Sequence, residues 1–117
     1  MTKNYFKRSE EWCPCCKGGG LLTDFHDKLN EAREIAGVPF VLNSAFRCPE
    51  HNSVVGGSET SSHMAGLAVD IKAEDSRTRY LILKGLFAVG LHRIGIGKTF
   101  IHVDDDLTKP AGVVWLY

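Results

Sequence analysis

The chain has 117 residues, of which 44% are hydrophobic and 24% charged, and its fourteen basic and fourteen acidic side chains cancel. This composition is typical of one soluble domain with a single core. The balanced charge gives no reason to expect nucleic acid as a partner, and no apolar run approaches the ~20 residues that span a membrane. Residues 1–8 lack the apolar segment of a secretory signal, so we expect synthesis in the cytoplasm without a signal peptide.

We expect a single domain over 1–117, which opens with an N-terminal arm over 1–20 that carries a cysteine cluster and ends in three glycines. Apolar side chains then recur at helical spacing and predict a helix over 23–36. Thr23 is a good N-cap residue for this helix, and Gly37 is a typical stop signal.

A short strand is predicted next, followed by an irregular, serine-rich stretch over 44–62 that is typical of a binding loop. A second helix is predicted over 76–89. The predicted strands cover 38–42, 67–71, 93–96, 100–103 and 113–116. Two helices on one side of a small antiparallel sheet make an α+β domain. We expect Trp115 in the core, with a place in the wall of a substrate cleft as the alternative.

Two short motifs carry the chemistry of this sequence. Residues 61–70 read S-x-H-x-x-G-x-A-x-D, and residues 102–104 read H-x-D. Strand alternation lets Asp70 lie beside His102 if the two strands pair. Together with His63 they are two imidazoles and one carboxylate, a ligand set typical of a catalytic zinc ion. The alternative is a hydrogen-bonded structural pair of Asp70 and His102, with His63 in a surface loop.

The motifs resemble those of the zinc D-Ala-D-Ala carboxypeptidases and their relatives, the LAS group. This group includes the bacteriophage L-alanyl-D-glutamate endolysins and the hedgehog zinc domain. The stretch 43–52 is similar to the S-x-x-R-x-P-x-x-N segment of the family, and Gly56-Gly57 precedes the metal motif at the usual distance. The resemblance covers roughly residues 22 to 117, with the motifs in the expected order.

The resemblance implies a hedgehog/D-Ala-D-Ala peptidase-like fold and zinc held by His63, Asp70 and His102. It implies that Arg47 lies near the scissile carbonyl or the substrate's carboxylate. It also implies a peptide substrate with D-amino acids, as in the stem peptide of bacterial peptidoglycan. A carboxypeptidase and an endopeptidase both fit. We expect a phage or prophage origin, with action on the cell wall after phage-type release or delivery.

One position departs from the family pattern. Relatives carry Glu three residues before the last zinc ligand or His two residues before it, whereas this chain has Thr99 and Phe100 there. Asp104 is therefore the provisional general base, although it could equally orient His102. Because the usual base is missing, a second hypothesis stays open: a non-catalytic module that uses zinc for stability and binds the cell wall or a protein.

Four cysteines require a separate explanation. Cys13 and Cys16 form a C-x-x-C pair, Cys15 lies between them, and Cys48 and His51 form a C-x-x-H pair. The two pairs could hold a second, structural zinc ion. A disulfide between Cys48 and one N-terminal cysteine is an alternative, as are thiols that mainly pack in the interior.

Overall fold

The computed structural model describes residues 4–117, so the first three residues of the predicted arm lie outside the described part. Its helices and strands, in chain order, are η1 (Arg8–Glu10), α1 (Thr23–Ala36), β1 (Leu42–Ser44), α2 (Pro49–Val54), η2 (Ser62–Ala65), β2 (Ala68–Lys72), α3 (Ser76–Ala88), β3 (Arg93–Ile96), β4 (Phe100–Asp104) and β5 (Val113–Leu116). The predicted α+β class is confirmed.

The strands form one five-stranded sheet in the order β1-β2-β4-β3-β5. Every neighbouring pair is antiparallel except β3 and β5, which run parallel. The sheet is therefore mostly antiparallel, rather than wholly so as the sequence suggested. In the central pair Asp70 lies opposite His102, which confirms the register that strand alternation predicted.

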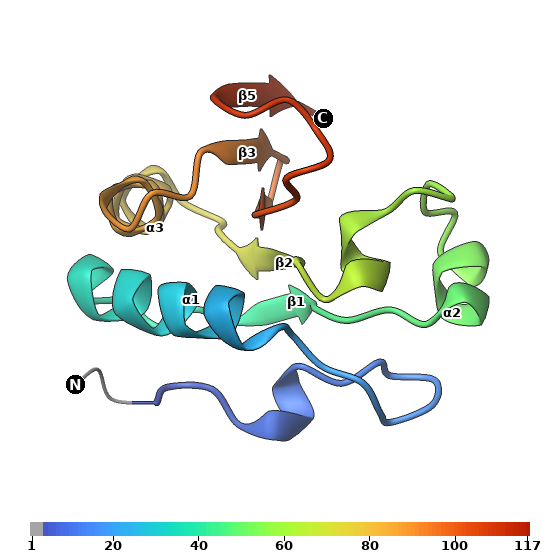
Figure 1. Ribbon diagram of the computed structural model, residues 1–117. Coiled ribbons are helices and arrows are strands. Elements are labelled where there is room, and N and C mark those ends of the chain that lie inside the picture. Colours follow the sequence, from blue (N-terminus) through green and yellow to red (C-terminus); the bar gives the residue numbers. More distant parts are fainter. Residues whose placement is uncertain (1–3) are drawn as a thin grey trace.

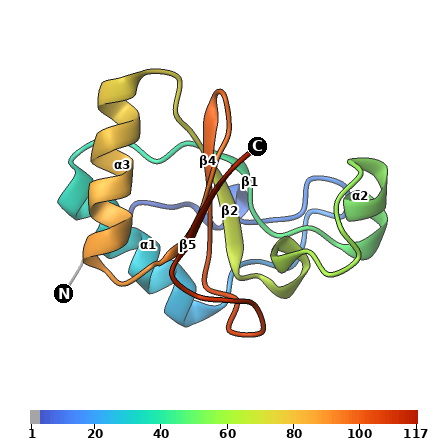
Figure 2. The ribbon, with the colours of Figure 1, turned by 90° about the horizontal axis from the view of Figure 1, so that it is seen from above.

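Helices α1 and α3 lie against each other on one side of the sheet (Figures 1 and 2). The core forms between their apolar faces and the inward residues of the strands, among them Phe25, Leu29, Ile82, Val69 and Ile101. Because side chains alternate along a strand, Asp70 and His102 point away from this core. Burial of one face of the sheet in the core thus determines which side chains lie on its other face.

Three local predictions were wrong. The first strand begins at Leu42 rather than at residue 38, because Pro39 has no backbone N–H with which to pair. The stretch 44–62 is not irregular throughout, since Pro49 at the first helical position starts α2. Leu22, and not Thr23, occupies the N-cap of α1, which ends as predicted at Gly37.

The N-terminal arm runs beneath α1 and β1 and turns back close to α2 (Figure 1).

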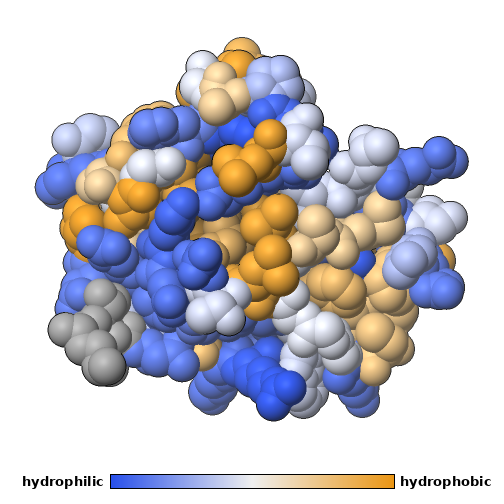
Figure 3. Space-filling model, in the orientation of Figure 1, coloured by the Kyte–Doolittle hydropathy of each residue, from blue (hydrophilic) through white to orange (hydrophobic). Residues whose placement is uncertain are grey.

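On the face of the molecule that is seen in the orientation of Figure 1, hydrophobic side chains gather over the middle, with hydrophilic side chains around them (Figure 3). Within residues 4–117, no helix is long and apolar enough to cross a membrane.

Candidate metal centre

Three different elements bring the predicted metal ligands together. His63 lies on η2, whose N-cap Ser61 accepts a hydrogen bond from the His63 backbone N–H at 3.2 Å. Asp70 and His102 lie on β2 and β4, in direct cross-strand register. His63 is only 2% exposed, so the interpretation that places it in a surface loop is wrong.

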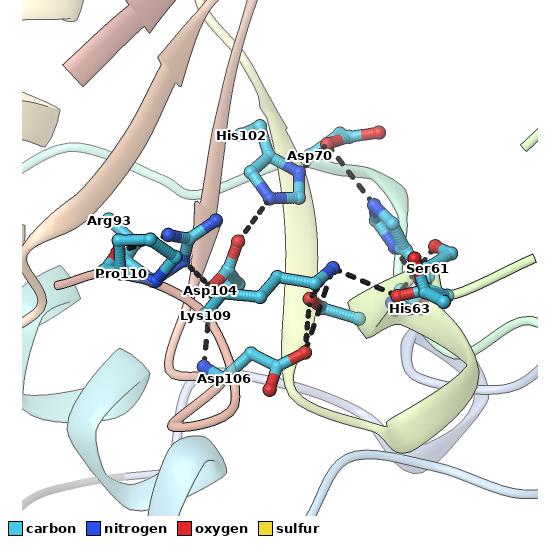
Figure 4. A network of polar contacts seen from close by, with 12 residues as sticks. Ser61, His63, Asp70, Arg93, His102, Asp104, Asp106, Lys109 and Pro110 are labelled. Atoms are coloured by element: carbon cyan, nitrogen blue, oxygen red, sulfur yellow. Dashed lines mark hydrogen bonds and ion pairs between the residues drawn. The ribbon is translucent and has the colours of Figure 1, made fainter. Parts of the chain in front are cut away.

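The three side chains converge on one point (Figure 4). Asp70 Oδ1 lies 3.0 Å from His102 Nδ1 and 3.4 Å from His63 Nε2. One ligand atom from each residue lies within 4.8 Å of the other two. Two imidazole nitrogens and a carboxylate oxygen at this spacing fit a catalytic zinc ion, which takes three protein ligands and keeps a fourth position open.

The second nitrogen of each imidazole, which does not face Asp70, makes a hydrogen bond to an oxygen on the other side of the ring. His63 Nδ1 lies 2.8 Å from the carbonyl oxygen of Ala45, to which it donates. His102 Nε2 lies 2.7 Å from Asp104 Oδ2. Metal-binding histidines usually donate their second N–H to such an acceptor, which fixes the tautomer and leaves the other nitrogen free to bind. The donor set and its support thus both fit a metal.

The same contacts shift the titration of the cluster. Burial raises the pKa of Asp70, but its contacts with His102 and His63 outweigh burial and hold this pKa well below its usual range. Burial lowers the pKa of His102, but the hydrogen bonds to Asp104 and Asp70 outweigh it and raise this pKa. Asp70 is therefore ionised at neutral pH, as a ligand to a cation must be.

Asp104 lies on the far side of His102 from Asp70, and only 2% of it is exposed. Its Oδ2 contacts His102 Nε2, and its Oδ1 accepts a hydrogen bond from Arg93 Nε at 2.7 Å. Both oxygens are thus engaged away from the point where the three ligand atoms meet. This geometry favours a positioning role, in which Asp104 orients His102, over the provisional role of general base.

Asp104→Asn separates these two roles. The amide oxygen still accepts from His102 but carries no charge, so we expect zinc affinity to fall by about 10-fold, within the range for such partners. At saturating zinc we expect turnover to recover to within a few-fold of the parent. A general base would instead cost about 10²–10⁴-fold in turnover with zinc affinity intact. Zinc titration and turnover at saturating zinc measure the two quantities separately.

Arg47 lines the same cleft as the three ligands. Its backbone N–H donates to the carbonyl of His63 at 3.2 Å, and its Nη1 donates to Asn52 Oδ1 at 3.3 Å. Gly57 leaves room for this arrangement, because a Cβ there would lie 2.9 Å from Nη1. The predicted loop thus does deliver Arg47 to the metal centre.

One donor of Arg47 is unused. Its Nε is buried and has no hydrogen-bond partner among residues 4–117. Burial lowers the pKa of Arg47, and the charges of Asp70 and Tyr117 offset only part of this lowering. An unpaired buried donor costs free energy, so the position of Arg47 is not explained by its contacts within the chain alone.

The cleft has a volume of about 400 Å³. Trp115 belongs to its wall, which was the alternative in the sequence analysis, rather than to the core as expected. Its ring centroid lies 5.5 Å from that of His102. Gly95 admits the indole, because a Cβ there would lie 2.6 Å from Trp115 and from Tyr117. The alternation of Gly95 with Ile94 and Ile96 is the signal that could have indicated this open face.

Arg93 and Lys109 are two further side chains that the sequence analysis missed. Arg93 faces Asp104 across β3 and β4. Lys109 Nζ donates to Ser62 Oγ and to the Thr60 carbonyl, both at 2.9 Å. Together with Arg47 they give the cleft three cationic side chains against two carboxylates, Asp70 and Asp104. A bound metal ion would add further positive charge.

Asp106 fastens the loop after β4 to η2 and is 7% exposed. It accepts hydrogen bonds from Ser62 Oγ at 2.7 Å and from the backbone and hydroxyl of Thr108 at 3.0 and 2.6 Å. Burial raises the pKa of Asp106, but these hydrogen bonds from Thr108 and Ser62 outweigh it and lower the pKa to about 2. This carboxylate holds the residue next to His63 in place.

We expect Asp106→Ala to lower the free energy of unfolding at pH 7 by about 1–3 kcal/mol, because it leaves buried hydrogen-bond donors without an acceptor. The ordinary carboxyl pKa is 3.8 and the folded value about 2. The stabilisation by the charge is therefore present above pH ~4 and is lost as the pH falls toward 2, so the difference from the parent should shrink there.

Urea unfolding at pH 7 and at pH 2.5 tests this prediction, with Asp105→Ala as the matched control. Asp105 makes a more exposed ion pair with Lys28 at 2.8 Å, which should contribute less than about 1 kcal/mol. Equal losses in the two variants would contradict the role given to Asp106.

Comparison with known proteins agrees with the geometry. The family model described as Peptidase M15 matches residues 4–104, most of the chain, and the chain therefore belongs to this family. Peptidases of this family are zinc-dependent metallopeptidases. No curated protein gives a significant match to the chain.

Proposed function

From its membership of the peptidase M15 family, we propose that this protein hydrolyses peptide bonds formed by D-amino acids in the stem peptide of bacterial peptidoglycan. One observation carries the proposal: the side chain of Arg47 lines the same cleft as the converging ligand atoms of His63, Asp70 and His102. In a metallopeptidase, the metal polarises the scissile carbonyl, and a nearby cation can stabilise the oxygen on which negative charge develops.

The residues present fit a division of tasks. Held by His63, Asp70 and His102, zinc would activate a water molecule and polarise the scissile carbonyl. Arg47 would bind the substrate's carboxylate, or the oxygen on which negative charge develops. Asp104, through its contact with His102 Nε2, would keep that imidazole oriented.

The charge and shape of the cleft support a stem peptide as substrate. Its three cationic side chains outnumber its two carboxylates, and this excess of positive charge suits the several carboxylates that such peptides carry. The flat indole of Trp115 and the ring of Tyr117 form an apolar wall beside His102. A wall of this kind would pack against the methyl groups of alanine residues.

Two synthetic peptides test the proposal and identify the bond. One ends in L-Lys-D-Ala-D-Ala, the other contains an internal L-Ala-D-Glu bond, and all-L versions of both are the controls. We expect zinc-dependent cleavage of one D-containing peptide and no cleavage of its all-L version. Cleavage of the first would assign a carboxypeptidase, and cleavage of the second an endopeptidase. Binding without cleavage of either peptide would instead support a non-catalytic module.

A further inference from the structure

A second group of metal-ligating side chains lies outside the cleft. Cys13, Cys15 and Cys16 belong to the N-terminal arm, whereas Cys48 directly precedes α2. The structure nevertheless brings all four Sγ atoms within 4.8 Å of one another. Cys15 Sγ lies 3.1 Å from Cys48 Sγ and 3.4 Å from Cys13 Sγ, and Cys13 Sγ lies 3.5 Å from Cys48 Sγ. All four are free thiols.

We propose that Cys13, Cys15, Cys16 and Cys48 bind a second zinc ion as four thiolates. Four cysteine ligands around one tetrahedral ion are a common structural zinc site, and a Zn–S distance of ~2.3 Å places neighbouring sulfurs about 3.8 Å apart. Among Cys13, Cys15 and Cys48, outward shifts of only a few tenths of an ångström give this spacing. Binding would release the thiol protons to solvent and leave no open position for a substrate.

The backbone around the cluster is already arranged to support thiolates. The arm folds into a turn in which the Cys13 N–H donates to the Gly18 carbonyl at 2.9 Å and the Lys17 N–H to the Cys13 carbonyl at 2.8 Å. The backbone N–H of Cys48 points at Cys13 Sγ at 3.4 Å, and that of His51 at Cys48 Sγ at 3.5 Å. Donors aimed at sulfur stabilise the negative charge that thiolate ligands carry.

This ligand set differs from the one that spacing alone suggested. The C-x-x-H pair implied His51 as the fourth ligand, but His51 does not belong to the cluster. It lines a cleft beside the cluster, together with Trp12 and Cys13. Cys15 takes its place. In a turn this tight, the residue between the two members of a C-x-x-C pair also reaches the common centre.

A zinc ion here would join the N-terminal arm to the loop that carries Arg47. Cys48 follows Arg47 directly and is the N-cap of α2. On α2, Asn52 accepts from Arg47 Nη1 and donates to the Ser58 carbonyl at 2.8 Å. The arm has little regular structure, with only η1 among its described residues. A metal would therefore add an anchor to the hydrogen bond that the Phe46 N–H donates to the Glu11 carbonyl at 3.3 Å.

Zinc content measured by elemental analysis and native mass spectrometry, on protein purified under reducing conditions, tests the proposal. We expect two zinc ions in the parent and one in His63→Ala. We expect none when Cys15→Ser is added to His63→Ala, whereas adding His51→Ala should leave that one zinc in place. Cobalt substituted into His63→Ala should give the intense thiolate-to-cobalt charge-transfer absorption of a sulfur site.

The cobalt spectrum is measured on a protein that keeps all four cysteines, so it tests the proposed zinc site even if the variant with Cys15→Ser does not fold. A His63→Ala protein that folds but holds no zinc would overturn the proposal. Iron in place of zinc, or a mass lower by the two hydrogens of a disulfide, would also overturn it. The proposed peptidase site fails separately, because its absence would leave one zinc in the parent that His63→Ala retains.

Discussion

His63→Ala is expected to bind one zinc ion fewer per chain than the parent and to lose peptidase activity. The substitution removes Nε2, one of three converging ligand atoms, from a residue that is 2% exposed. The remaining Asp70 and His102 cannot complete the set of three protein ligands that a catalytic zinc ion needs. We expect the activity to fall by more than the ~10–100-fold that loss of a ligand-orienting partner costs.

His92→Ala is the matched control for this experiment, because His92 is exposed and contacts Phe87, outside the cleft. It should keep the parent's zinc content and activity. Circular dichroism of both variants checks that they fold. A folded His63→Ala protein with the zinc content of the parent would show that the metal centre lies elsewhere.

Arg47→Ala is expected to lower kcat/KM for the cleaved peptide by about 10²–10³-fold, the usual cost of one donor that stabilises developing charge. Zinc content should not change, because Arg47 contributes no ligand atom to the metal centre. Arg47→Lys keeps the charge but loses the planar fork that holds a carboxylate with two parallel hydrogen bonds, so we expect only partial recovery.

Steady-state kinetics on the cleaved synthetic peptide measure these losses, with Arg77→Ala as control. Arg77 is exposed at the start of α3 and lies outside the cleft. If Arg47→Ala retained the kcat/KM of the parent, Arg47 would have only a structural role in holding Asn52 and the loop.

The parts of the fold that the sequence predicted well are those with a strong local pattern. Alternation over 67–71 and 100–104 predicted both the strands and their faces, because a shift of one residue would move every apolar side chain out of the core. That constraint placed Asp70 opposite His102. The helices α1 and α3 likewise followed from apolar spacing and the glycines after them.

The parts that the sequence did not predict depend on contacts between distant segments. The parallel pairing of β5 with β3 places Trp115 opposite Gly95, and nothing local to residues 113–116 indicates its direction. The engagement of Asp104 by Arg93 is also a cross-strand contact. Cys15 reaches Cys48 across 33 positions of the chain, so spacing could indicate a cysteine site but not its members.

The most direct test of the proposed function is mass spectrometry of muropeptides released from bacterial sacculi after incubation with the zinc-loaded protein. A chelated sample and His63→Ala are the controls. We predict loss of terminal D-alanine, or scission within the stem peptide, only in the zinc-loaded parent. Unchanged muropeptides across sacculi of several chemotypes, from a folded protein with zinc bound at His63, Asp70 and His102, would contradict the assignment as a peptidoglycan peptidase.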